Sequence, residues 1–502
     1  MKRCKLIKKL TSAAVCAAML LGIFCSGTAA SAATTTPSGY ISVYEQEISA
    51  YSGAIDALAE GMRNRQEQIN ISSYRVPIDK ARVIFEAVIN KNPELFYVAG
   101  RFGYNYYQNS GNNYIYSLNP SYLYARDEVN EMMAEFDKKS EYYLSKITPD
   151  MSEFEKALIL HDELILNSSY LLDGSTYTLM VDGTGKCEDY SRAYAFLLAN
   201  AGIKSEMMLS STADGNTQGM NHQWVKVRID GSYYHVDPTW DDPVVKNASW
   251  YQTSGEARPN GYTGMVFHTY FLVSDELIGT NSLGRPHTGY TTFYPSPQTY
   301  DNAAFRDVTA PFCYVDGTLY TVINNSSGNT ALVSYNPQAD SFSELTSMSL
   351  YWSTPSGGYW VGSFSGLNYL DGLFYFNGPS KVYTYDLATG QTAEFASKPG
   401  NDNIYGINII NRDLYAYTTS TPSELRDGHL LAHIDEPLPP LAPGDVDANG
   451  YIDIRDATAV QRHLAMFITL DQRQLAAADF NGDSKIDVDD ATDIQKYIAH
   501  II

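Results

Sequence analysis

The chain has 502 residues, which is too long for a single hydrophobic core, so several domains are expected. Its composition, 44% hydrophobic and 18% charged, is that of a globular protein, and its formal net charge is −22. Such an acidic surface repels a phosphate backbone, so nucleic acid is excluded as an expected partner.

Residues 1–32 have the pattern of an export signal. A basic start precedes an apolar run from Ala13 to Phe24, and Ala30-Ser31-Ala32 offers a cleavage site of small residues. The run is shorter than the roughly 20 residues that a membrane span needs, and no other segment fits a span. The sequence therefore predicts a secreted, extracellular protein that has no membrane partner.

Removal of this signal leaves 30 basic and 57 acidic residues, a formal charge of −27, and two cysteines, Cys187 and Cys313. Two cysteines exclude a disulfide framework, although they could pair with each other.

Residues 33–145 are expected to form a helical N-terminal extension. Apolar periodicity predicts helices at Val43–Met62, Asp79–Ile89 and Asp127–Ile147, with a tyrosine-rich stretch through Tyr124 before the last of them. This extension could mask the domain that follows, but we expect it to pack against that domain as an ordinary part of it.

The next domain, predicted at 146–288, opens with a helix whose start is marked by Ser152 and Glu155 as a capping box. A second helix is predicted at 187–202, with Cys187 as its first residue after the glycine-containing turn 183–186. Backbone N–H groups and the dipole at a helix N-terminus favour a thiolate. A lone cysteine before a helix is more often a small buried residue, so the chemical interpretation needs a partner.

A predicted hairpin supplies that partner. Asp230-Gly231 is the strongest short hairpin signal, and a two-residue turn there pairs Trp224 with Asp237. His222 then becomes a diagonal neighbour of Asp237 on one face, close enough for the carboxylate to orient the imidazole. The opposite face, which we expect to be buried, carries Val225, Val227 and Ile229.

These residues suit acyl transfer. Cys187 would attack an acyl carbon, His222 would take and return the proton, and Asp237 would fix the histidine tautomer and stabilise the imidazolium. His235 lies on the same face nearer the turn, with a small chance of a catalytic role, and His161 is interpreted as a structural residue on a helix.

Three blocks in this region resemble the transglutaminase-like superfamily of papain-type cysteine enzymes. They are Gly185-Lys186-Cys187-Glu188-Asp189-Tyr190-Ser191, His222-Gln223-Trp224 and His235-Val236-Asp237-Pro238-Thr239-Trp240. The resemblance implies a papain-type core with Cys187 as nucleophile, His222 as base and Asp237 as orienting residue.

The sequence departs from the family beside the cysteine, where smaller or apolar residues are usual. Lys186 could help to hold a thiolate, whereas Glu188 and Asp189 suit the helix dipole but oppose a nearby thiolate. Tyr170 and Asn167 are weak candidates for an oxyanion-hole side chain.

The resemblance leaves the reaction open. Hydrolysis of peptide or amide bonds is favoured because water is abundant outside the cell and nothing marks an amine site. Protein cross-linking by transamidation comes second, and a non-catalytic binding or adhesion component third, although the intact triad argues against the latter. A polysaccharide hydrolase would need two positioned carboxylates, and no pair stands out.

Residues 289–435 are predicted to form a separate β-rich region. The phrase Tyr314–Tyr320 recurs at Tyr369–Tyr375, and 411–415 is a weaker third copy. Such repeats are typical of β-propeller blades, but three copies fall short of the usual four or more, so a β-sandwich or an open stack of blades is equally admissible. The function of this region cannot be read from the sequence.

A proline-rich linker, residues 436–443, precedes two acidic loops displaced by 34 residues in the module 444–502. The first supplies oxygen ligands at positions 1, 3, 5, 9 and 12 of an EF-type loop, and the second repeats them. The candidate ligands are Asp445, Asp447, Asn449, Asp453 and Asp456, then Asp479, Asn481, Asp483, Asp487 and Asp490. Ser484 stands at position 6 of the second loop, where glycine is usual for the sharp turn.

This module resembles the type I dockerin of cellulosomal proteins. The resemblance implies two bound calcium ions and a cohesin domain of a scaffold protein as partner. Positions 10 and 11 help to choose the partner in that family, and here they differ between the loops, as Ile454-Arg455 and Val488-Asp489. Symmetry-related docking in two orientations is therefore in doubt.

The predicted fold class is α+β: a helical N-terminal region, a transglutaminase-like core, a separate all-β repeat region and a small calcium-binding helical dockerin. The predicted function is a secreted, cellulosome-associated cysteine enzyme acting on protein or peptide substrates, with no cofactor in catalysis. An accessory role in polysaccharide degradation is an alternative.

Overall fold

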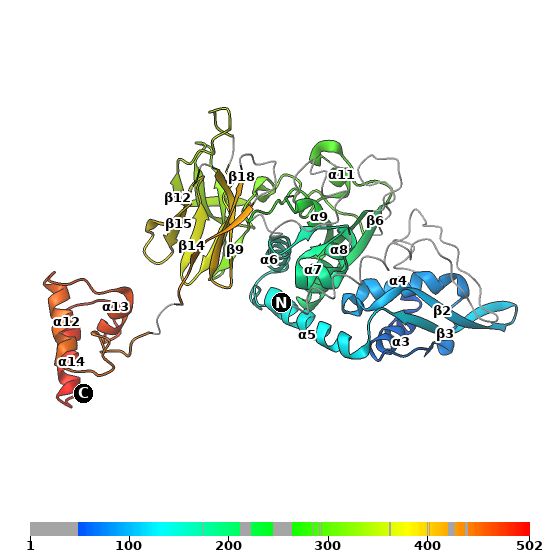
Figure 1. The fold of residues 1–502 in the computed structure, drawn as a ribbon, viewed down its shortest axis with the longest axis horizontal. Coiled ribbons are helices and arrows are strands. Elements are labelled where there is room, and N and C mark those ends of the chain that lie inside the picture. Colours follow the sequence, from blue (N-terminus) through cyan, green and yellow to red (C-terminus); the bar gives the residue numbers. More distant parts are fainter. Residues whose placement is uncertain are drawn as a thin grey trace. The chain divides into compact units, whose positions relative to one another are not determined.

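The computed structural model describes residues 49–172, 174–210, 222–243, 264–284, 286–290, 292, 294–360, 363–398, 400, 402–419, 427–436 and 440–502. The predicted export signal and residues 437–439 of the predicted linker lie outside these residues. The chain divides between His433 and Ile434 into two compact units (Figure 1). In the described residues, no helix is both long enough and apolar enough to cross a membrane.

Where the structure describes the N-terminal region, it contains three α-helices, three short 3-10 helices and a long hairpin. The α-helices are α3 (Ser52–Arg63), α4 (Ala81–Lys91) and α5 (Arg126–Leu144). The tyrosine-rich stretch forms β2 (Val98–Asn109) and β3 (Asn112–Tyr122), which pair with the short β1 (Ile69–Asn70) in the order β1-β3-β2.

This hairpin was not assigned from the sequence. Its turn is Ser110-Gly111, and both residues have positive φ, 51° and 83°, as the tight turn of a hairpin requires. Serine rarely adopts this conformation, so the turn carried a weaker sequence signal than Asp-Gly or Asn-Gly does.

The region predicted as the catalytic domain combines helices with a three-stranded sheet. Its helices are α6 (Glu153–Leu166), α7 (Thr176–Asp182), α8 (Cys187–Asn200), α9 (Pro238–Asp241) and α11 (Asp275–Ile278). Its sheet has the order β6-β7-β8, with β6 (Ser205–Ser210), β7 (His222–Ile229) and β8 (Ser232–Val236), and β4 (Ser169–Tyr170) pairs in parallel with β5 (Thr184–Gly185).

The sequence signals in this region are confirmed. Ser152 and Glu155 form a reciprocal capping box at the start of α6, and α8 begins at Cys187. Asp230 and Gly231 both have positive φ, and β7 pairs with β8 in the predicted register as far as Val225 and Val236. The ladder ends there, so the predicted pair of Trp224 with Asp237 does not form, and Asp237 is instead the N-cap of α9. The strand is buried on both faces, because Trp224 and Lys226 are covered as well as the valines.

The β-rich region consists of three antiparallel meanders. Their strand orders are β12-β11-β10-β9, β13-β14-β15-β16 and β17-β18-β19. The strands are β9 (Cys313–Val315), β10 (Thr318–Asn324), β11 (Thr330–Asn336), β12 (Ser341–Met348), β13 (Leu367–Leu370), β14 (Leu373–Asn377), β15 (Lys381–Asp386), β16 (Thr392–Ser397), β17 (Asn403–Ile410), β18 (Asp413–Thr419) and β19 (Asp427–His433).

Each copy of the repeated phrase is the first hairpin of one meander. The turns Asp316-Gly317, Asp371-Gly372 and Asn411-Arg412 all have positive φ at both residues and join β9 to β10, β13 to β14, and β17 to β18. The sequence repeat therefore reflects a structural repeat of blade-like sheets.

The first meander shares a hydrophobic core with the helices. One cluster of buried residues runs from Ala54 to Tyr335, and the ring of Phe154 in α6 lies near those of Phe305 and Tyr335. Chain segments also approach each other closely where Gly264 and Gly366 meet the backbone of Ile407 in β17. The predicted boundary at 288/289 thus does not coincide with a gap in the core; the domain limits themselves stay predictions.

The second unit contains α12 (Ile454–Leu464), α13 (Gln472–Ala478) and α14 (Val488–Ile498). Each acidic loop leads into a helix: Asp453 is the N-cap of α12 and Asp487 is the N-cap of α14. The fold as a whole confirms the α+β class, with separate small sheets and clustered helices.

Gly366→Ala is expected to destabilise the β-rich region by about 1–3 kcal/mol. A Cβ there would lie 2.3 Å from the Gly264 carbonyl oxygen and 2.7 Å from the Ile407 nitrogen, and backbone atoms cannot yield cheaply. Gly358→Ala is the matched control, since its Cβ would meet only the Thr354 hydroxyl, at 3.4 Å. Thermal unfolding of the two variants checks this, and equal midpoints would contradict it.

Candidate active site

Cys187 is the first residue of α8, at the helix N-terminus. The turn before it is fixed by the Lys186 backbone N–H, which donates to Asp189 Oδ2 at 3.0 Å. Gly185 is required for this arrangement, because a Cβ at that position would lie 2.8 Å from the Cβ of Asp189. The expected placement of the cysteine where a loop enters a helix is therefore observed.

The charged residues around Cys187 are engaged with one another. The Lys186 ammonium lies 3.1 Å from Glu188, and Arg192 lies 2.5 Å from the same carboxylate. Arg192 in particular lowers the pKa of Glu188 to about 2. Burial and the neighbouring Glu188 raise the pKa of Asp189 to about 6. Lys186 is thus paired with Glu188, and Glu188 is neutralised by two cations.

His222 lies between Cys187 and Asp237. Its Nε2 donates to Asp237 Oδ2 at 2.5 Å, and the Cys187 side chain lies beside the ring. Burial by itself would lower the pKa of His222, but the charge and hydrogen bond of Asp237, assisted by Cys187, raise it to about 10. The structure therefore brings the three predicted catalytic side chains together, with His222 favoured as an imidazolium.

A fourth residue, His287, completes the site and was missed in the sequence. Its Nε2 donates to the same Oδ2 of Asp237 at 2.8 Å, and the ring is fully buried. The other oxygen, Oδ1, accepts the Thr239 backbone N–H at 3.1 Å. Burial would raise the pKa of Asp237, but His222 and His287 outweigh it and hold the carboxyl ionised.

Aromatic rings enclose these groups. Trp224 stacks on His222 with ring centroids 5.8 Å apart and an angle of 16° between planes, and Trp240 lies 5.1 Å from the same imidazole. His287 packs edge-on against Trp224 at 4.6 Å. Low-dielectric walls of this kind strengthen the attraction between imidazolium and carboxylate.

His235 has a structural role in this arrangement. It accepts a hydrogen bond at Nδ1 from the Trp224 indole N–H at 2.8 Å, and its Nε2 donates to Asp275 at 2.8 Å. Burial lowers the pKa of His235 to about 4, so the ring is neutral and suited to this acceptor role. It orients Trp224, which covers the His222 imidazole.

Of the two candidates for the oxyanion hole, only Tyr170 lies beside Cys187. Burial, followed by the proximity of Cys187 and two aspartates, raises the pKa of Tyr170, and the Cys187 backbone forms a hydrogen bond with its hydroxyl. The phenol therefore stays protonated. The Asn167 amide instead donates to Glu163 at the end of α6.

The second cysteine takes no part in the site. Cys187 and Cys313 are both free, so the alternative of a disulfide between them does not hold. Cys313 belongs to β9, and desolvation raises the pKa of its thiol.

Within the described residues, three groups have donor atoms close enough to hold a metal ion. These groups are His161, Asp162 and His268; His222, Asp237 and His287; and Asp445, Asp447 and Asp456. In the first two, ring nitrogens and carboxylate oxygens are already at hydrogen-bond distance. The third group consists of carboxylate oxygens in a loop that turns sharply at Gly450, where φ is positive. Oxygen ligands of this kind fit calcium.

The second acidic loop has the same backbone construction. Asp479 accepts the N–H groups of Asp483 and Ser484, as Asp445 does those of Asn449 and Gly450. Ser484 has a φ of 65°, which confirms that it occupies the position where glycine is preferred.

Comparisons with known proteins agree with this geometry. Residues 141–238 match the family model of the transglutaminase-like superfamily, and residues 443–499 match that of the dockerin type I domain. Both resemblances found in the sequence are confirmed. Among curated proteins, no relative matches the chain.

Several solved structures are similar to part of the chain. One is a TGase, with 13% identity and a TM-score of 0.19, covering 27% of this chain and 43% of its own. Another, a candidate cysteine protease from Cytophaga hutchinsonii, has 12% identity and a TM-score of 0.18, covering 28% and 63%. A third, a candidate protease from Parabacteroides distasonis ATCC 8503, has 13% identity and a TM-score of 0.17, covering 27% and 35%. The chain spans less than two thirds of each, and at such TM-scores these likenesses add nothing further.

Asp237→Asn is expected to remove a pH-dependent part of the stability. Because the pKa of His222 is raised from 6.5 to about 10 in the folded protein, its contribution is complete below pH 6.5 and is lost as the pH rises through 10. The stability advantage of the wild type over Asp237→Asn should therefore shrink by a few kcal/mol across that window, at about 1.4 kcal/mol per pKa unit.

Urea unfolding followed by tryptophan fluorescence at pH 6, 8 and 10 measures this difference. Asp413→Asn is the matched control, because it breaks the exposed pair between Asp413 and His433, whose histidine side chain is 59% exposed. A wild-type advantage over Asp237→Asn that stays constant with pH would contradict the assignment of an imidazolium at His222.

Proposed function

We propose that this chain, which contains a transglutaminase-like core and a type I dockerin domain, is a secreted cysteine enzyme. It acts on peptide or amide bonds through Cys187, His222 and Asp237. The observation that carries the proposal is the position of His222, which lies beside Cys187 and is hydrogen-bonded to Asp237 at 2.5 Å.

The first half of the proposed reaction is acylation. The Cys187 thiolate attacks the carbonyl carbon of an amide, and the tetrahedral oxyanion is stabilised by the Cys187 backbone N–H and the Tyr170 hydroxyl. His222 then donates its proton to the departing amine as the C–N bond breaks, which leaves a thioester on Cys187. Asp237 and His287 keep the ring of His222 in place throughout.

The second half transfers the acyl group to an acceptor. Neutral His222 removes a proton from water, whose oxygen attacks the thioester, and the thiolate leaves as the acid product forms. We favour water as the acceptor, which makes the enzyme a peptidase or amidase. An amine would use the same intermediate and give a cross-linking transglutaminase.

The dockerin would place this activity on a scaffold. Dockerin type I domains typically bind calcium, and both loops present the carboxylate and amide oxygens that calcium prefers. Candidate ligands are Asp445, Asp447, Asn449, Asp453 and Asp456 in the first loop, and Asp479, Asn481, Asp483, Asp487 and Asp490 in the second. Exposed Tyr451, Ile454, Met466, Phe467 and Val488 give the module apolar surface for a cohesin domain.

Cys187→Ala is expected to abolish turnover, because the thiol is the attacking group. The measurement incubates wild type and variant with a protein library and reads both new peptide termini and incorporation of a labelled amine. Termini that depend on Cys187 indicate hydrolysis, and amine incorporation that depends on it indicates transamidation. Cys313→Ala is the matched control and should keep full activity; equal products from wild type and Cys187→Ala would contradict an enzymatic role.

Removal of calcium is expected to abolish cohesin binding, because the ions hold the acidic loops together. Calorimetric titration with cohesin, before and after chelation, measures this loss. Asp445→Ala should weaken binding by at least tenfold, about 1.4 kcal/mol, whereas Asp435→Ala, which lies before the linker 436–443, should leave it unchanged. Cohesin binding that persists in excess chelator would contradict the role of the loops.

A further inference from the structure

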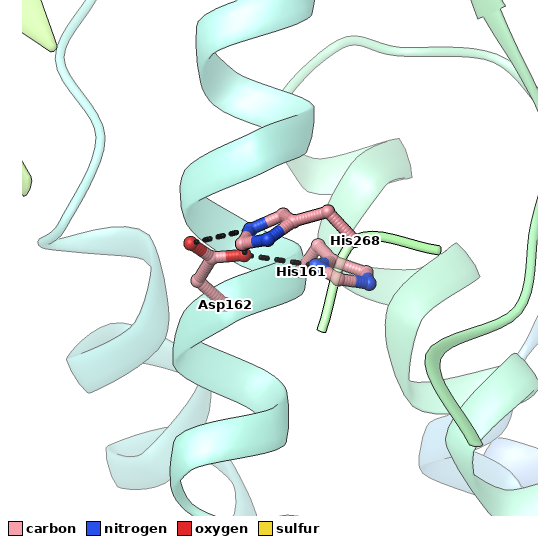
Figure 2. A group of neighbouring side chains, drawn as sticks. All are labelled: His161, Asp162 and His268. Carbon is pink, nitrogen blue, oxygen red and sulfur yellow. Dashed lines mark hydrogen bonds and ion pairs between the residues drawn. The ribbon is translucent and has the colours of Figure 1, made fainter. Parts of the chain in front are cut away.

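A second cluster of buried titratable side chains lies apart from Cys187. His161 and Asp162 are neighbours on α6, and His268 comes from the segment before Tyr270. All three are buried, with exposed fractions of 0%, 1% and 0%. Figure 2 shows the Asp162 carboxylate pointing toward both imidazole rings.

Every ring nitrogen in the cluster faces an oxygen. His161 Nδ1 lies 2.9 Å from Asp162 Oδ1, and its Nε2 lies 3.2 Å from Asp241 Oδ2. His268 Nε2 lies 3.1 Å from Asp162 Oδ1, and its Nδ1 lies 2.9 Å from the Val308 carbonyl oxygen. The Phe312 backbone N–H donates to Asp162 Oδ2 at 2.7 Å.

These partners determine where the protons are. A carbonyl oxygen only accepts, so His268 Nδ1 donates to Val308. His161 has an aspartate at each nitrogen, so its ring can donate at both. Each buried carboxylate of the cluster therefore has hydrogen-bond partners, which its burial requires.

The pKa directions support an ion pair between His161 and Asp162, whereas burial raises the pKa of Asp241. Burial would lower the pKa of His161, but Asp162 and Asp241 raise it to about 9. Burial would raise the pKa of Asp162, but His268 and His161 outweigh it and lower it.

The network ends on the helix that carries the catalytic carboxylate. Asp241 is the last residue of α9, whose N-cap is Asp237. Asp241 Oδ1 accepts the Tyr270 backbone N–H at 2.8 Å, and the Tyr270 carbonyl in turn accepts the Asp237 backbone N–H at 3.1 Å. The backbone of Asp237 is thus held through α9 and through Tyr270, and both routes pass through Asp241.

We propose that His161, Asp162, His268 and Asp241 are positioning residues that fix Asp237, and through it His222, for catalysis. The network also reaches the entry to the first β-meander through the Phe312 backbone and Val308. This inference deepens the proposed function and rests on it, since the consequence of losing the network is a weaker imidazolium beside Cys187.

The test measures the reactivity of Cys187 without any substrate. The rate of alkylation by iodoacetamide is followed from pH 5 to pH 10 by mass spectrometry of the Cys187 peptide, so that Cys313 is resolved separately. In the wild type, rapid alkylation should persist at neutral and mildly acidic pH, because His222 stabilises the thiolate. His161→Gln should shift the profile to higher pH by about one unit, which lowers the rate at neutral pH by roughly tenfold.

Two further variants keep the test decisive. Asp241→Asn has almost the same volume, keeps an acceptor for Tyr270 and loses the charge, so it should shift the profile in the same direction and carries the test if His161→Gln fails to fold. His433→Gln changes an exposed histidine and should leave the profile unchanged. Circular dichroism of each variant establishes that it is folded.

The outcomes separate this inference from the proposed function. An ordinary thiol profile in the wild type would overturn the activated cysteine and the proposed function with it. An activated wild type with the same profile in folded Asp241→Asn would overturn the positioning role alone. The positioning role would also be overturned if the wild type binds one equivalent of a transition metal and His268→Gln does not. A metal ion would then replace the protons between the rings and Asp162.

Discussion

The Asp237 carboxylate is the point on which the candidate active site depends. One of its oxygens accepts from both His222 and His287, and the other accepts from the backbone of Thr239. A buried carboxylate is costly unless its lone pairs are used, and here each oxygen has a donor. The same contacts fix the imidazole that faces Cys187, so the charge balance of Asp237 and the orientation of His222 are one constraint.

Local backbone geometry brings these groups together. The two-residue turn at Asp230-Gly231 sets the register of β7 and β8, and this register carries His222 and Asp237 to the same end of the hairpin. The capped turn before α8 independently sets Cys187 at a helix N-terminus. Strand β7 is buried on both faces. A one-residue change of register would turn Lys226 or a valine toward the site and would destabilise the sheet.

Much of this geometry could be predicted because it depends on short-range sequence patterns. Capping at Ser152, the Asp-Gly turn and the spacing of the acidic loops each depend on residues close in sequence. His287 and the link from His161 to Asp241 were not predictable, because they join residues 50 and 80 positions apart through packing. The β2–β3 hairpin was missed for a local reason, since serine at a positive-φ position gives little signal.

We expect Cys187 to form a covalent acyl intermediate only when His222 is held by Asp237. The most direct measurement is peptide mass spectrometry after a brief reaction with an activated acyl donor, quenched in acid to preserve a thioester. The acyl group should be found on Cys187 in the wild type, be strongly reduced in Asp237→Asn and be absent from Cys313. Equal acylation of both cysteines, or of Cys187 in wild type and Asp237→Asn, would contradict the account.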